Sequence, residues 1–465
     1  MKPITRLSKT YLTVILMIVV AATSCKKLIQ IPTNPTNKLS KDRIFADSAN
    51  IVAAVAGVYG NFGVTQSNLG FGNGAITIYT GLASDELIVG SETYTAPAFF
   101  ENTILPDNSI VASMWSDAYK NIYQINICLD GVAKTTAISD KLKRQLIGEL
   151  KTDRAFYYYF MANIWGGVPI ITSTDYKVTQ STPRATLTDV FNFVLTDLKD
   201  AQQLLTAAYP SSGRKRPNLY VAEALLSKVY LYLGQYQNAI DAASTVISSP
   251  LYRLETLDRV FLSESSEAIW QLPANGANQE TPEGASFIPF DATYQPNFVM
   301  SPQLLGAFES NDPRLTQWTN ANTIGTDTYY YPNKYKNTLP GQTPLEDYMI
   351  LRLADIYLVR AEAFAELEKY TEAMADLNTV RDRAADRPDL TAASKTQALT
   401  LIAHERQVEL FCEWGNRWID LKRTKMIDAV LGPIKSSWVP TDSLFPIPNN
   451  ERQANPYLNQ NPGYR

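Results

Sequence analysis

The sequence has few of the side chains on which common catalytic and metal sites depend. Its 465 residues include one histidine and three cysteines, so a serine or cysteine triad has only His404 as its base. That histidine stands among charged residues in the helix-like stretch IAHERQVEL, where we expect a solvated or capping role. No Cys/His cluster has zinc spacing and no GxxxxGK[ST] phosphate loop is present. We therefore predict a protein that is not an enzyme, with no catalytic residue, metal site or cofactor.

Carboxylate pairs keep one enzymatic alternative open. Asp85 with Glu86, and Glu346 with Asp347, could serve glycoside hydrolysis. That chemistry is defined by the separation of two carboxyl groups in space, which a sequence does not give. A glycosidase therefore stays as a less favoured alternative.

An excess of charge of one sign is also absent. The chain carries 42 Lys and Arg against 46 Asp and Glu, a formal net charge of −4. Phosphate-backbone binding needs a clustered basic face, so we predict no nucleic-acid partner. The hydrophobic content of 45% suffices for a large core. The length fits two or three domains, or one long helical array.

The apolar run at the N-terminus is short and is followed by a cysteine. Three basic residues precede the apolar stretch from Tyr11 to Ala22, which is typical of a secretory signal. It is shorter than the roughly 20 residues that span a bilayer. The segment resembles a bacterial lipoprotein signal, in which residues 1–24 are removed and Cys25 becomes a lipidated first residue with several acyl chains. An ordinary secretory signal with an incidental cysteine is the alternative.

The other two cysteines, Cys128 and Cys412, sit in the helix-like stretches QINICLDGV and VELFCEWGNRW. Bulky helical neighbours favour buried free thiols. A single disulfide between them is the alternative.

The clearest pattern in the chain is an internal repeat. Residues 222–247 align with residues 357–380, so that Tyr236 falls on Tyr370 and the alanine three residues later also matches. Each segment predicts two helices joined by a short turn, which resembles the tetratricopeptide pattern; a plain helical hairpin is the alternative. Such repeats need neighbours to bury their faces, and stretches near residues 50, 120, 150 and 195 carry apolar residues at three-and-four spacing.

Three stretches of another character interrupt these helices, at about 64–108, 252–343 and 431–465. They are rich in Gly, Asn, Pro, Thr and Tyr and have little helical periodicity. Long irregular segments are usually functional or disordered, and the many aromatic residues argue against disorder. We expect the helical scaffold to cover about 41–63, 109–251 and 344–430.

Six segments, in this order, resemble SusD/RagB-type proteins, which are outer-membrane nutrient-binding lipoproteins of Bacteroidetes. They are KDRIFADSANIVAAVAGVYGNF, RAFYYYFMANIWGGVPI, TPRATLTDVFNFVLTDLKDAQQLL, LRLADIYLVRAEAFAELEKYTEAMADLNTVRDRA, HERQVELFCEWGNRWIDLKRT and LFPIPNNERQANPYLNQNPGY. The resemblance implies a mainly α fold, with a tetratricopeptide-like helical scaffold, long loop-rich insertions and minor short β-strands. It also implies a lipid-anchored tether over residues 25–40 and a single SusD-like domain over residues 41–465.

The same resemblance implies a function. The loop-rich face would hold an oligosaccharide, or in some members a peptide, and would cap a SusC-type TonB-dependent barrel during import. The lipid on Cys25 would anchor the protein in the outer membrane, facing the cell surface. Lys26 and Lys27 stand where family members often carry acidic residues, which leaves the leaflet open. A tetratricopeptide-type protein-interaction lipoprotein is the alternative function.

Ligand binding is expected in the irregular stretches. Sugars present flat C–H faces ringed by hydroxyls, so a site needs an exposed aromatic platform with amide or carboxylate groups at its edges. Trp115, Trp165 and Trp414 lie in helical pattern and are expected in the core, and Trp270 is expected in a short buried strand. Tyr294 is one aromatic residue of the second stretch. The ligand-binding candidates are Phe71, Asn73, Tyr94, Phe99, Trp318, Tyr329 and Tyr330.

Acidic residues recur every four positions near the C-terminus. Glu405, Glu409 and Glu413 follow this spacing, and Arg417 stands four residues further on. The spacing is typical of ion pairs on a helix surface, which is our prediction, because a buried cluster would need a partner for every member. A catalytic or ligand-binding role is the alternative.

Overall fold

The computed structural model of the protein is mainly helical, with three two-stranded antiparallel sheets among the residues that it describes. These residues are 40–60, 69–91, 96–274, 280–339, 341–385 and 387–464. The observed helices and short strands confirm the predicted fold class. The predicted signal peptide and Cys25 lie outside the described residues. Within them, no helix is both long and apolar enough to cross a bilayer.

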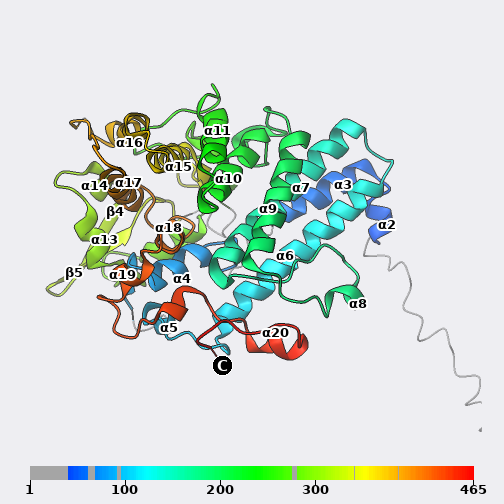
Figure 1. The fold of residues 1–465 in the computed structure, drawn as a ribbon, viewed down its shortest axis with the longest axis horizontal. Helices are drawn as coiled ribbons and strands as arrows, with labels where there is room; N and C mark the ends of the chain where they lie inside the picture. Colours follow the sequence, from blue (N-terminus) through cyan, green and yellow to red (C-terminus); the bar gives the residue numbers. More distant parts are fainter. Residues whose placement is uncertain are drawn as a thin grey trace, which may run out of the picture.

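One half of the molecule is a bundle of long helices, on the right of Figure 1. Its members are α3 (Ser48–Gly60), α6 (Ser109–Lys134), α7 (Asp140–Trp165) and α9 (Leu187–Leu204). The side chains of Asn108, Ser139 and Thr186 cap the first turns of the last three. Every residue of α7 from Thr152 to Trp165 is buried, and both α6 and α9 pack on this helix. The helix α7 therefore runs through the core rather than over the surface.

The two predicted repeats form helical hairpins that stack on each other. They are α10 (Leu219–Tyr232) with α11 (Tyr236–Ile247), and α15 (Leu353–Glu366) with α16 (Tyr370–Ala384). The helix α11 packs against α15, although a long segment separates the two in sequence. The matched alanines, Ala239 and Ala373, are both fully buried. The helix α17 (Lys395–Glu409) packs on α15 and α16 and extends the array.

The irregular stretches contain short helices and strands, and of these the sequence placed only the buried strand around Trp270. The first stretch holds α4 (Ala75–Ala83), β1 (Leu87–Val89) and α5 (Pro97–Phe100). The second holds β2 (Ala268–Pro273), α12 (Pro282–Phe287), β3 (Phe298–Met300), α13 (Pro302–Ala307), α14 (Pro313–Gln317), β4 (Thr319–Ile324) and β5 (Asp327–Pro332). The helix α4 escaped prediction because all of its residues are buried, so it has no polar face that would produce a helical period.

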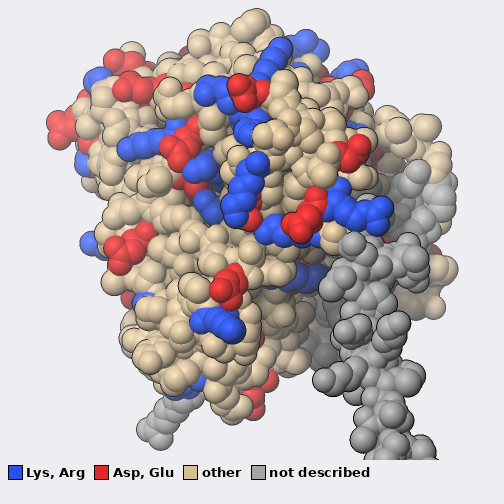
Figure 2. Space-filling view, turned by 90° about the vertical axis from the view of Figure 1, so that its right-hand side faces the viewer, with Lys and Arg blue, Asp and Glu red and all other residues tan. Residues whose placement is uncertain are grey.

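The remaining described elements connect these parts. The strand β2 pairs with β6 (Asp347–Arg352), and Trp270 of β2 is fully buried, as predicted. The others are α2 (Lys41–Ile44), α8 (Tyr176–Thr179), η2 (Ser212–Arg214), α18 (Asn416–Arg423), α19 (Ile427–Leu431), η3 (Pro440–Ser443) and α20 (Asn449–Ala454). On the face drawn in Figure 2, Lys and Arg are interspersed with Asp and Glu, so this face presents no unbroken basic surface.

The prediction of helix through residue 412 is wrong, although the burial predicted there is confirmed. The helix α17 ends at Glu409 and α18 begins at Asn416, and between them Cys412 and Trp414 have φ angles of 51° and 49°, which end a helix. Both side chains are buried, and Cys412 is a free thiol like Cys128 in α6. Trp115 and Trp165 also lie in the core, where their rings meet edge to face at 5.2 Å.

Candidate functional site

The first two irregular stretches meet as neighbouring strands. The strand β1 pairs with β3, so that Leu87 lies opposite Met300. Beyond the pair, the backbone N–H of Gly90 donates to the carbonyl of Asn297 at 2.9 Å, and the amide of Gln295 donates to the carbonyl of Gly90. The structure thus brings together the two stretches in which the ligand was expected.

The third irregular stretch packs against the first. The buried Lys435 ammonium donates to the carbonyls of Leu82 at 2.6 Å and Phe100 at 2.7 Å. The backbone N–H of Asn449 donates to the carbonyl of Pro106 at 2.9 Å. The second and third stretches are therefore both fixed to the first by hydrogen bonds to its backbone, which holds the loops in a defined arrangement.

Exposed aromatic rings gather where the second stretch turns back on itself. Phe290 is 90% exposed and Tyr294 is 57% exposed, and their rings meet edge to face at 5.8 Å. The side-chain amide of Asn322, in β4, donates to the carbonyls of Asp291 at 2.9 Å and Tyr294 at 2.7 Å. The turn that carries the two rings is therefore tied to the β4–β5 hairpin.

The two predicted tyrosines, Tyr329 and Tyr330, lie on opposite faces of the β4–β5 hairpin. Tyr329 is the cross-strand partner of Asn322, so both side chains lie on the hairpin face that meets the 291–294 turn. Tyr330 points to the opposite face because side chains alternate along a strand. We call Phe290, Tyr294 and Tyr329 the aromatic edge. Sequence reasoning did not single out Phe290, a lone aromatic residue between proline and aspartate with no periodic pattern around it.

A second aromatic site lies at the other end of the molecule. A cavity of about 290 Å³ opens between α6, α8 and α20, and we call it the aromatic pocket. Its lining includes Trp115, Tyr119, Tyr123, Tyr176, Gln180 and Glu451. Three of these rings recur every four residues along α6, a signal that the sequence contained. Sequence reasoning assigned Trp115 to the core, correctly, and did not consider the pocket beside it.

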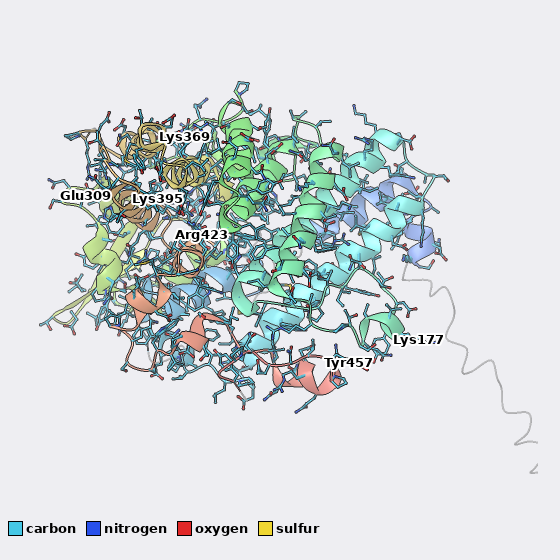
Figure 3. The ribbon with its side chains drawn as sticks, in the orientation of Figure 1. Lys177, Glu309, Lys369, Lys395, Arg423 and Tyr457 are labelled. Carbon is cyan, nitrogen blue, oxygen red and sulfur yellow. The ribbon has the colours of Figure 1, made fainter. Side chains whose placement is uncertain are left out.

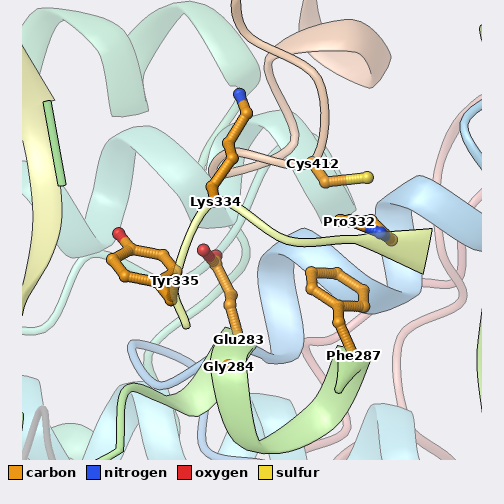
Figure 4. A pocket seen from close by; sticks show the side chains of 7 residues that line it. All are labelled: Glu283, Gly284, Phe287, Pro332, Lys334, Tyr335 and Cys412. Atoms are coloured by element: carbon orange, nitrogen blue, oxygen red, sulfur yellow. The ribbon is translucent and has the colours of Figure 1, made fainter. Parts of the chain in front are cut away.

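A third cavity is too small for a substrate. Glu283, Phe287, Lys334 and Cys412 are among the residues around it (Figure 4), and its volume is about 10 Å³, roughly the space of one water molecule. Burial raises the pKa of Glu283 to about 8 and raises the pKa of the Cys412 thiol well above its usual value. A thiol in that state is a poor nucleophile. No group of three or more His, Cys, Asp or Glu side chains in the described ranges is placed to hold a metal ion.

Two family descriptions match most of the chain between them. The SusD family matches residues 300–464, and a SusD-like family described as starch-binding associating with the outer membrane matches residues 41–231. The chain is a SusD-type protein. It is 26% identical to SusD-like protein P38 of Formosa agariphila, over 78% of this chain and 82% of that protein. It is 25% identical to SusD-like protein P25 of the same organism, over 95% and 97%.

Solved structures agree with this membership. A laminarin-binding SusD-like protein is 26% identical with a TM-score of 0.76, over 90% of this chain and all of that one. The surface glycan-binding protein A of Bacteroides thetaiotaomicron is 20% identical with a TM-score of 0.74, again over 90% of this chain and all of that one. The second likeness, at this identity, concerns the fold alone. The predicted SusD-like fold is thereby confirmed.

Several sequence-predicted site residues of this SusD-type protein pack inside it. The rings of Phe71, Phe99 and Trp318 are fully buried. Phe71 stacks on Trp165 with centroids 5.6 Å apart, and the Trp318 indole donates to the carbonyl of Leu257 at 2.9 Å. The expectation of exposed ring platforms is not met at these three positions, because the loops use their large rings to pack onto the scaffold. Asn73 is also buried, and Tyr94 lies outside the described residues.

The acidic residues near the C-terminus form a buried network, and the prediction of surface pairs is wrong. Glu405 and Glu409 are fully buried. Arg352 donates to Glu267 at 2.9 Å, to Glu409 at 2.5 Å and to Glu413 at 2.8 Å. Their partners come from distant parts of the chain, so spacing along one helix could not distinguish a buried cluster from a surface one.

The charges in this network are matched, which favours a structural role. Burial alone would raise the pKa of Glu409, but Arg383, Arg352 and Arg314 hold it well below its usual value. Arg314 itself donates to Asp312, Glu405 and Glu409. The ring nitrogen Nε2 of His404 lies 2.7 Å from the carbonyl of Ala307, the last residue of α13. That contact fits the capping role expected for this residue.

Proposed function

We propose that this SusD-type protein is a cell-surface lipoprotein that binds a glycan and works with a SusC-type TonB-dependent transporter in its import. The observation that carries the glycan assignment is the aromatic edge, in which Phe290 and Tyr294 expose their rings and Tyr329 is half-buried, on a turn tied to the β4–β5 hairpin. The starch-binding description of one matching family and the likeness to a laminarin-binding structure support a glycan rather than a peptide.

The chemistry of the edge suits a sugar. Ring faces carry negative charge that attracts the polarised C–H groups of a sugar face. Asp291 is exposed in the same turn, and hydrogen bonds from Thr293 hold its pKa below the usual value. The carboxylate is therefore an ionised acceptor for sugar hydroxyls beside the platform. Tyr94, in the same irregular stretch as β1, stays a candidate for the same site.

The anchor and the transporter complete the proposal. A diacylated Cys25 with a further acyl chain on its amino group would give a stable membrane attachment, because two or more chains are needed for one. The starch-binding family description includes association with the outer membrane, which supports that location. The resemblance on which the SusC-type partner rests covers nearly the whole chain from Cys25.

The test is calorimetric titration of alanine variants with laminarin and with soluble starch. Phe290→Ala, Tyr294→Ala and Tyr329→Ala should each weaken binding by a few-fold to about tenfold. The reason is that aromatic stacking contributes roughly 0.5 to 1.5 kcal/mol, and about 1.4 kcal/mol corresponds to a factor of ten. Each variant is first checked for an unchanged melting temperature, since none of the three rings belongs to the core.

Two further variants make the result specific. Leu367→Ala removes an exposed apolar side chain, 38% exposed, at the end of α15 and outside both aromatic sites, and should bind like the unmodified protein. Tyr330→Ala changes the opposite hairpin face. If Tyr330→Ala weakens binding and the three edge variants do not, the ligand lies on that face and the aromatic edge is the wrong site.

A further inference from the structure

We propose that the aromatic pocket between α6, α8 and α20 is a second carbohydrate-binding site, separate from the aromatic edge. The proposal rests on the proposed function in one respect, because the ligand is another part of the same glycan chain. The pocket's volume, about 290 Å³, is at the lower end of the range for small-molecule sites, roughly 300 to 1,000 Å³. It therefore suits a short piece of a sugar chain.

The rings of the pocket run from buried to exposed. Trp115 is buried and packs against Tyr119 with centroids 5.0 Å apart. The Tyr119 hydroxyl donates to the carbonyl of Pro169 at 2.8 Å, which fixes that ring. Tyr123 is 48% exposed and Tyr176 is 73% exposed, so these two offer ring faces to a ligand. A carbohydrate site needs such a combination of fixed wall and accessible platform.

Polar groups stand beside these rings. Glu451 is half-buried, and Trp115 donates a side-chain hydrogen bond to it. Gln180, at the end of α8, is exposed and adds an amide that both donates and accepts. No Lys or Arg is among the residues that line the cavity, which disfavours a phosphate or another anion. A purely apolar ligand would in turn cover the carboxylate and the amide without offering either a further hydrogen-bond partner.

Hydrogen bonds within the protein hold the walls of the pocket in place. Asn455, in its lining, donates to the carbonyl of Thr182 at 2.8 Å and accepts from the backbone N–H of Tyr457 at 3.1 Å. These bonds fasten the C-terminal segment after α20 to the segment after α8. Figure 3 accordingly places Lys177 of α8 and Tyr457 at the same lower end of the molecule. A preformed site loses less freedom when it binds.

The two aromatic sites lie at opposite ends of the protein. Figure 1 shows β5 at the lower left, with α8 and α20 at the lower right. A long glycan that reaches both sites binds the second one as an intramolecular event, which raises the overall affinity. We therefore expect a long glycan to bind more tightly than a short oligosaccharide of the same linkage. This difference in affinity should disappear when either site is removed.

The experiment titrates the mature full chain with short oligosaccharides and polymers of laminarin and starch. The pocket variant Tyr123→Ala/Tyr176→Ala and the edge variant Phe290→Ala/Tyr294→Ala are compared with the control Leu367→Ala, all at unchanged melting temperature. We expect each double variant to lose a few-fold to tenfold in affinity for the polymer, with a larger loss when the two are combined. Glu451→Gln, which keeps the shape of the side chain, should also weaken binding.

A spectroscopic measurement locates the ligand directly. In protein labelled with 5-fluorotryptophan, the Trp115 resonance is assigned by its loss in Trp115→Phe. Adding the oligosaccharide to the edge variant should shift that resonance, because the remaining site is the one beside Trp115. A Trp115 resonance that does not shift at a saturating concentration of sugar would contradict the proposal that the pocket binds carbohydrate.

The outcomes separate the two proposals. If the pocket variant binds like the control while the edge variant loses affinity, the pocket proposal is overturned and the proposed function stands. If only the pocket variant loses affinity, the pocket stands and the aromatic edge is wrong. If neither glycan binds, both are overturned. Saturable binding of choline with no sugar binding would assign the aromatic rings and Glu451 to an organic cation instead.

Discussion

Arg352 is a buried side chain whose charge is surrounded by carboxylates. It is 1% exposed and its guanidinium meets three carboxylates, those of Glu267, Glu409 and Glu413. Burying charged groups is costly unless each has a partner, so the network holds β6, β2 and the end of α17 in one arrangement. The stability of this part of the core therefore depends on the balance between buried positive and negative charges.

Replacing this arginine should strongly destabilise the fold. Arg352→Leu leaves three buried carboxylates short of a cation, and loss of one partner of a buried pair typically costs about 3 to 5 kcal/mol. The measurement is the free energy of unfolding in denaturant. Arg253→Leu is the matched control, because Arg253 is 71% exposed and pairs with Glu255 at 3.2 Å; it should change stability by less than about 1 kcal/mol. Equal effects of the two changes would contradict the account.

Glu283 should make the stability fall as the pH rises. Burial raises the pKa of its folded form to about 8, against an ordinary value of 4.5. Between these values the folded protein keeps a proton that the unfolded chain has lost. The protonated carboxyl group therefore contributes fully to the free energy of unfolding below pH 4.5, and this contribution disappears as the pH passes 8.

The Glu283→Gln variant isolates this effect. The amide should still accept hydrogen bonds from Thr77 and Tyr348 but cannot ionise. The unfolding free energy of the unmodified protein, minus that of the variant, should fall between pH 5 and pH 8 by roughly 1.4 kcal/mol per pH unit. A difference that stays constant over this range would show that Glu283 titrates normally.

At this scale the sequence predicts burial better than it predicts exposure. Helical apolar spacing placed Trp115 and Trp165 in the core, and both cysteines were expected as buried thiols. Phe71, Phe99 and Trp318 were expected at the surface because they stand in irregular sequence, and they are buried instead. An aromatic residue in a loop either covers the scaffold or faces solvent, and only tertiary packing decides between the two.

At the scale of elements, a close contact at Phe45 helps to hold α2 to the helical bundle. Phe45, which ends α2, lies over Gly131 of α6: a Cβ added at Gly131 would sit 2.4 Å from three atoms of the Phe45 ring. The Thr135 hydroxyl also donates to the Phe45 carbonyl at 2.6 Å. This contact fixes the first described helix on the bundle.

Two glycine substitutions test this contact against helix propensity. Alanine is better than glycine in a helix by roughly 0.5 to 1 kcal/mol. Gly57→Ala in α3 should gain about that much, because a Cβ there meets no atom within 4 Å. Gly131→Ala should instead lose about 1 to 3 kcal/mol through overpacking against Phe45. If thermal unfolding shows both variants stabilised, α2 does not pack as described.

Elements with a regular apolar period were predictable, and those without one were not. The repeat helices and the long helices α6, α7 and α9 appear where spacing placed them. The helix α4 is buried on every side. The segment after Glu409 has a helix-like sequence, but Cys412 and Trp414 within it have positive φ angles. In both places the fold is decided by contacts with distant segments, such as the bond from the backbone N–H of Cys412 to Glu86 at 2.9 Å.

At the scale of the whole molecule, the proposed lipid anchor would account for Cys25. Cys25→Ala should release the protein from membranes into the soluble fraction, because lipidation at this residue provides the proposed attachment. Cys128→Ala is the matched control: it removes a buried thiol from α6 and should leave the protein in the membrane fraction. Fractionation with a label for acyl chains makes the comparison. A Cys25→Ala protein that is still acylated and membrane-bound would rule out the anchor.

The central claim is that this scaffold presents its loop face to a glycan. The most direct measurement is calorimetric titration of the unmodified mature protein with laminarin and soluble starch, beside the edge variant Phe290→Ala/Tyr294→Ala. We predict saturable binding to at least one of the two glycans, weakened by a few-fold to tenfold or more in the edge variant. Absence of binding to either glycan, or equal binding by the two proteins, would contradict the claim.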